Sequence, residues 1–104
     1  MPYQVIRSGT ARQDIRRYFR YLKREAGEDI MRSYMVALEH DIRVVIANHP
    51  HAFGWFDAGA PYRAKLFKLA RTTFWIIYTV DDDRQCVEIR RFWNAAQQPT
   101  THGL

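Results

Sequence analysis

The chain has 104 residues and a mass of 12.4 kDa, which leaves room for one domain with one modest core. Its 47% hydrophobic and 14% aromatic content exclude a disordered protein. No apolar run approaches the ~20 residues of a membrane span, and the first residues lack a signal-peptide pattern, so we expect a cytoplasmic protein without a membrane partner.

The net charge of +5 is unevenly distributed along the chain. Residues 1–24 carry seven Lys or Arg and one acid, residues 25–61 carry two against six, and residues 62–104 carry seven against four. Two basic ends attract a phosphate backbone or an acidic protein segment, although basic faces often serve solubility alone. The single cysteine excludes an internal disulfide and a zinc site built on cysteines.

The first predicted elements are a short strand and a helix. Residues 3–8 are rich in β-forming residues and lead into Gly9, which is typical of an edge strand. Thr10, followed three residues later by Gln13, has the capping-box pattern and predicts that a helix begins there. Gly27 is expected to end it. The apolar stripe of this helix consists of Ala11, Ile15, Phe19, Leu22 and Ala26, and its opposite face is basic.

A second helix is predicted to follow at once. It begins near the acidic pair Glu28 and Asp29, which suits the helix dipole, and ends before Asn48, His49 and Pro50. Such a short connection predicts an antiparallel helical hairpin. Residues 50–61 have no apolar period and are rich in Gly and Pro, so they are interpreted as a loop.

Three β-rich runs complete the chain, at residues 62–70, 73–80 and 85–93. The middle run is apolar at both alternating sets of positions, so we expect it to be the central strand. The predicted fold is α+β with the order β-α-α-β-β-β: one domain of residues 1–98 with a flexible tail at 99–104. The helical hairpin covers one face of a small, mainly antiparallel sheet, and the other face stays partly open.

The strands carry a set of cations that could recognise phosphate. Because side chains alternate across a strand, Arg63 and Lys65 are expected on one face, Lys68 on the other, and Arg90 and Arg91 on opposite faces. The alternative is a solvated face whose charges protect exposed edges. The candidate target- or nucleic-acid-binding residues are Arg63, Lys65, Lys68, Arg71, Arg90, Arg91, Trp93 and Asn94.

Other chemistry is weakly supported by the sequence. His49 and His51 flank Pro50 without an acid or cysteine at ligand spacing, and no Ser or Thr has a nucleophile context, so we expect no metal and no cofactor. The acids at 81–83 are interpreted as a polar turn. The aromatic residues outside the regular pattern favour packing or partner docking over base stacking; these are Trp55, Phe56, Phe92 and Trp93.

Three segments together resemble the RelE/ParE superfamily of bacterial toxin–antitoxin systems, over about residues 3–98. They are "SGTARQDIRRYFRYL", similar to its helix opening; "IRVVIANHP", similar to its second helix; and "FWIIYTVDDDRQCVEIRRFWNAAQQ", similar to its last two strands. The resemblance implies a small basic toxin that a cognate antitoxin neutralises by wrapping the helical hairpin and sheet edge. We expect an acidic, amphipathic antitoxin segment to contact Arg16, Arg20, Tyr34 and Leu38.

The two branches of the superfamily imply different activities. RelE-like members cut mRNA on the ribosome with Lys, Arg and a terminal Tyr or His, whereas ParE-like members poison DNA gyrase and are not known as nucleases. Here Trp75 replaces the usual strand arginine, Asn94 and Gln97 replace a His-x-x-Arg pair, and no Tyr follows Trp93. Cleavage needs a base and an acid, and the only candidate for these roles here is a lysine with a lowered pKa. The candidate catalytic residues are therefore only cations: Lys65, Lys68, Arg71, Arg90 and Arg91.

The sequence thus favours a growth-inhibiting toxin that binds a macromolecular target such as gyrase and leans against an enzyme. The first alternative is a RelE-like, ribosome-dependent mRNA endoribonuclease. The second is a small basic nucleic-acid-binding module, suggested by the basic N-terminal segment.

Overall fold

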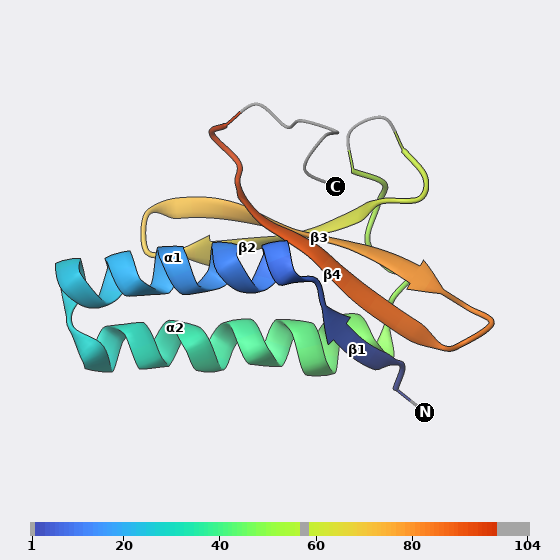
Figure 1. Ribbon diagram of the computed structural model, residues 1–104, viewed down its shortest axis with the longest axis horizontal. Coiled ribbons are helices and arrows are strands. Elements are labelled where there is room, and N and C mark those ends of the chain that lie inside the picture. Colours follow the sequence, from blue (N-terminus) through green and yellow to red (C-terminus); the bar gives the residue numbers. More distant parts are fainter. Residues whose placement is uncertain (1, 57–58, 98–104) are drawn as a thin grey trace.

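The computed structural model describes residues 2–56 and 59–97. Its element order confirms the predicted α+β fold with a strand, two helices and three further strands (Figure 1). The sheet has the strand order β1-β4-β3-β2, in which β1 is parallel to β4 and the other pairs are antiparallel. The elements are β1 (Gln4–Arg7), α1 (Gly9–Ala26), α2 (Glu28–His40), a π-helical turn η1 (Asp41–Ile46), β2 (Arg63–Leu69), β3 (Thr72–Asp81) and β4 (Cys86–Asn94). The predicted tail at 99–104 lies outside the described residues.

The start of α1 differs from the sequence prediction. Its N-cap is Ser8 and not Thr10: the Ser8 hydroxyl accepts a hydrogen bond from the Ala11 N–H at 3.0 Å. The same hydroxyl donates to the carbonyl of Arg90 at 2.9 Å. Ser8 therefore caps the helix and also ties it to β4, which a capping pattern read along the chain alone could not reveal. Gly27 ends the helix as predicted, with a φ of 94° that L-residues with side chains rarely adopt.

The main core lies between the helices and one face of the sheet. The predicted stripe of α1 is buried except for Ala26, which is exposed in the last turn. Phe74 and Phe92 stack at the centre of this core, with ring centroids 4.4 Å apart and nearly parallel planes. The helices contribute Ala11, Ile15, Phe19, Leu22, Leu38, Ile42 and Ile46, and the sheet contributes Phe67, Leu69, Phe74, Ile76, Tyr78, Val87, Ile89 and Phe92.

The second helix departs from the α form near its C-terminal end, where η1 follows α2. Its buried residues Leu38, Ile42 and Ile46 are each four positions apart and so lie on one face of the helix. Ile42 and Ile46, both within the π-helical turn, belong to the main core. No helix in residues 2–56 and 59–97 is long and apolar enough to cross a membrane.

An irregularity in β4 changes where its arginines lie. Ile77 pairs with Arg91 but the next residue, Tyr78, pairs with Ile89, so Arg90 is an extra residue in a β-bulge. Both Ile89 and Phe92 consequently face the helices, and the two residues between them do not enter the core. The prediction that Arg90 and Arg91 lie on opposite faces is therefore wrong, because the bulge interrupts the alternation on which it depended.

Candidate functional site: the open face of the sheet

The face of the sheet that the helices leave uncovered carries a row of apolar side chains. Leu66 on β2 lies opposite Trp75 on β3, and Trp75 lies opposite Trp93 on β4, so the three are in register across the sheet. We call Leu66 and these two tryptophans together the aromatic row, after its two aromatic members. Leu66 is 50% exposed, and both tryptophans are partly exposed. Large exposed apolar residues aligned in this way are typical of an interaction surface.

The loop before β2 packs against one end of the aromatic row. Phe56 is buried and forms a small second core with Ala64 and Ile77, and its ring meets that of Trp75 edge-on at 5.9 Å. Of the two roles expected for this aromatic residue, packing and partner docking, the structure shows packing against the domain. Its neighbour Trp55 is instead 54% exposed, and the guanidinium carbon of Arg63 lies 3.9 Å from the centre of its ring.

The cations on β2 are divided between the two faces, as strand alternation predicts. Lys65 lies on the helix side, where its ammonium binds Asp41 at 2.7 Å and the Leu66 carbonyl at 3.2 Å. Arg63 donates to the carbonyl of Phe53 at 2.7 Å. Neither residue contributes to the open face. Their charges serve contacts within the fold, and Lys65 in addition covers part of the β2 edge.

Lys68 and Arg71 are the two exposed cations near the aromatic row. Lys68 shares the face of Leu66, because it is two residues further along β2, and Arg71 lies in the turn to β3. Neither forms an ion pair with a carboxylate among the described residues. Both can therefore offer their charge to a partner.

The two arginines of the bulge are each bound to a carboxylate. Arg90 pairs with Glu88 at 2.7 Å, and both side chains are about one-third exposed. Arg91 pairs with Asp14 of α1 at 2.7 Å, with only 13% and 4% of the two side chains exposed. The guanidinium of Arg91 also lies 4.6 Å from the centre of the Trp93 ring. Arg91 thus joins the aromatic row to the helix layer.

Asp14 is the residue that sequence reasoning missed. It is the one acid in the first 24 residues, and it lies three residues after Ala11, on the buried side of α1. Its carboxylate accepts from Arg91 and from the backbone N–H of Phe92 at 3.1 Å, beyond the point where β1 stops pairing with β4. An acid on the apolar side of a predicted helix was the available signal, since a buried charge requires a partner.

The described part of the open face offers charges for binding but no histidine for proton transfer. His51 instead lies at the far end of β3, where it pairs with Asp82 at 2.8 Å, and Tyr3 donates to the same carboxylate oxygen at 2.8 Å. Tyr78 lies in the core, where its hydroxyl donates to the Pro50 carbonyl, and burial raises its pKa to about 12. Among the described residues, no cluster of His, Cys, Asp and Glu could hold a metal ion.

The four residues expected to contact an antitoxin do not lie on one surface. Arg16 and Arg20 are exposed on α1, and Tyr34 is half-buried against the core. Leu38 is only 1% exposed and is one of the central core residues. A contact between Leu38 and a partner is therefore excluded in this structure; the helical spacing that suggested an apolar seam at Leu38 reflected the core itself.

Comparison with known protein families gives a match over most of the chain. Residues 5–99 match the family described as "ParE toxin of type II toxin-antitoxin system, parDE". No curated protein matches the sequence.

Two solved structures have a similar fold. The toxin–antitoxin complex RelBE2 from Mycobacterium tuberculosis contains a chain with 18% identity and a TM-score of 0.60, over 90% of this chain and 99% of that one. The chromosomal ParDE system of P. aeruginosa contains one with 14% identity and a TM-score of 0.62, over 88% and 95%. Because the family match covers nearly the whole domain, the chain belongs to the ParE toxin family of type II toxin–antitoxin systems.

Proposed function

We propose that this toxin inhibits DNA gyrase by binding it through the open face of the sheet. Membership of the family makes the chain the toxin of a type II pair, with a cognate antitoxin as its neutralising partner. The observation that carries the choice of mechanism is the aromatic row, flanked by cations and without a histidine in the described part of that face.

The composition of this face favours a protein target. Tryptophan and arginine are enriched among the residues that dominate binding energy at protein interfaces. Trp93 with Arg91 beside it fits that pattern, and Leu66 adds apolar area that is half exposed in the isolated chain. Lys68 and Arg71 would favour approach to an acidic surface of the target.

The arrangement supports cleavage of RNA less well. Attack by a 2′-hydroxyl needs a base for its proton and an acid for the leaving oxygen. The nearby carboxylates of Asp14 and Glu88 are bound to Arg91 and Arg90, which commits them to ion pairs. Lys68 and Arg71 could stabilise negative charge, but cationic support is only one of the parts that cleavage needs.

A supercoiling assay with purified gyrase tests the proposal. We expect the wild-type toxin to inhibit supercoiling, and Leu66→Ser and Lys68→Glu each to raise the inhibitory concentration about tenfold. The matched controls are Val36→Ser, at an apolar residue of α2 that is 70% exposed, and Arg32→Glu, at an exposed cation of the same helix. Both controls should inhibit like the wild type. A toxin that blocks translation but leaves supercoiling intact would exclude gyrase as the target.

The remaining alternatives have their own readouts. New mRNA ends in primer extension from toxin-expressing cells, lost in Lys68→Glu, would establish the RelE-like endoribonuclease instead. A nucleic-acid-binding module would bind duplex DNA with a log–log salt slope of about −0.9 per neutralised phosphate.

Growth inhibition in the cytoplasm and a part in plasmid stabilization follow from the proposed function. Faster loss of a plasmid after deletion of the toxin–antitoxin pair would support the latter.

A further inference from the structure

A pocket of about 460 Å³ lies outside the open face, between the C-terminal half of α1 and the hairpin that joins β2 to β3. Leu22, Leu69 and Phe74 contribute apolar surface to it, and all three belong to the main core. The pocket is therefore on the helix side of the sheet, opposite the aromatic row. Its size lies in the range of roughly 300–1,000 Å³ that is usual for binding pockets.

Its border combines aromatic rings with positive charge. Tyr18 and Tyr21 line the pocket together with Arg17 and Arg24. Tyr21 is 55% exposed, although a large aromatic side chain gains most from burial. The Arg17 guanidinium lies 5.1 Å from the centre of the Tyr18 ring and 3.5 Å from the Asp14 carboxylate, while 66% of its side chain stays exposed. Its charge therefore has a defined place at the mouth of the pocket.

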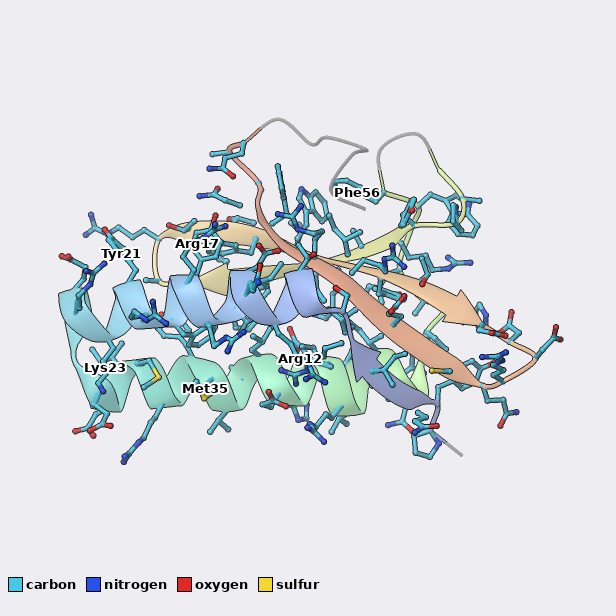
Figure 2. All side chains as sticks on the ribbon, viewed as in Figure 1. Arg12, Arg17, Tyr21, Lys23, Met35 and Phe56 are labelled. Carbon is cyan, nitrogen blue, oxygen red and sulfur yellow. The ribbon has the colours of Figure 1, made fainter. Side chains whose placement is uncertain are left out.

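The two faces of α1 present their charges to different neighbours. Figure 2 shows Arg17 and Tyr21 projecting from α1 toward the β2–β3 hairpin, whereas Lys23 projects toward α2. Arg16, adjacent to Arg17 in sequence, lines a separate hollow with Arg7, Arg12 and Ile15. The basic N-terminal segment therefore offers two distinct cationic surfaces, and the one at Arg17 adjoins a pocket lined by the core residues Leu22, Leu69 and Phe74.

We infer that this pocket anchors the cognate antitoxin. The segment that it fits carries a large apolar side chain, which fills the pocket beside Tyr21, and an Asp or Glu nearby in sequence that binds Arg17 or Arg24. Apolar filling excludes water around the arginines and so strengthens the ion pairs. The inference rests on membership of a toxin–antitoxin family and not on the choice of gyrase. It replaces the expectation of a contact at Leu38.

Titration calorimetry with the purified cognate antitoxin tests this inference. The double variant Arg17→Glu/Arg24→Glu should raise the Kd about 30-fold or more, as the loss of a central interface contact does. The control Arg16→Glu/Arg20→Glu makes the same change of charge on the same helix, at two exposed residues that do not line the pocket. It should raise the Kd less than about threefold, because exposed charges outside the contact contribute little.

A second pair of variants tests the pocket without changing charge. Thr72→Trp places a large ring in the pocket, whereas Thr73→Trp places the same ring on the opposite face of β3. We expect only Thr72→Trp to weaken antitoxin binding by about 30-fold. Thermal unfolding of each variant establishes that it is folded. The inference would be overturned if, in each pair, the test variant and its control lost the same affinity for the antitoxin. A greater loss of affinity in the Arg16→Glu/Arg20→Glu control would also overturn it. Since the titration contains no gyrase, its outcome is separate from that of the supercoiling assay.

Discussion

Removal of the Asp14 carboxylate should be the most damaging single change to the fold outside the apolar core. Asp14 accepts from the Arg91 guanidinium and from the Phe92 N–H, and its side chain is 4% exposed. In Asp14→Ala the buried guanidinium loses this carboxylate and the N–H of β4 loses its acceptor. Breaking a buried ion pair from one side costs about 3–5 kcal/mol of the free energy of unfolding. That is a large part of the ~5–15 kcal/mol that stabilises a typical domain.

Equilibrium denaturation followed by tryptophan fluorescence measures this loss. Asp14→Asn retains an oxygen for the Phe92 N–H while removing the charge, so we expect it to lose about 1–3 kcal/mol. Glu28→Gln is the control: it breaks the Glu28–Arg32 pair, whose side chains are 51% and 67% exposed, and should cost less than about 0.5 kcal/mol.

The result that would refute this reasoning is a loss of under about 1 kcal/mol in Asp14→Ala, or a loss equal to that of the control. A double-mutant cycle with Arg91→Met separates the pair from the remaining contacts of each residue. If the pair carries the effect, the double variant should be more stable than the sum of the two single losses predicts.

Three further predictions concern a tyrosine, a glutamate and a glycine. Because burial raises the pKa of Tyr78 to about 12, its stabilising contribution should be complete below pH 10 and fall as the pH rises toward 12. An ultraviolet titration compared with that of Tyr78→Phe measures its ionisation, and ionisation near pH 10 would contradict this expectation. Burial alone would raise the pKa of Glu39, but hydrogen bonds from Arg7 and Arg43 lower it below 4.5. The difference in stability between wild type and Glu39→Gln should therefore shrink as the pH falls from 4.5 through the pKa of Glu39, which acid denaturation measures. Gly27→Ala should cost about 1–3 kcal/mol in urea denaturation because of its φ of 94°, and Gly54→Ala, at a position without a positive φ, should cost less.

Residue patterns predicted the positions of some side chains in the candidate site but not of others. Alternation along β2 correctly separated Lys65 from Lys68, since a strand without irregularities keeps its period of two. The same rule failed for Arg90 and Arg91, because a bulge adds a residue on one strand without a marker in the sequence. The alignment of Leu66, Trp75 and Trp93 depends on the register of three strands, which no local pattern specifies.

The sequence by itself determined the order of the elements, the two helix faces and the domain's basic ends, because these follow from the spacing of neighbouring residues and from composition. Tertiary structure alone decided that Ser8 caps α1 against β4, that Asp14 holds Arg91, and that Leu38 lies in the core instead of on the surface. Each of these depends on which distant segments meet. An ion pair between residues 14 and 91 forms only after the helix has packed on the sheet, so its partners cannot be identified from either segment alone.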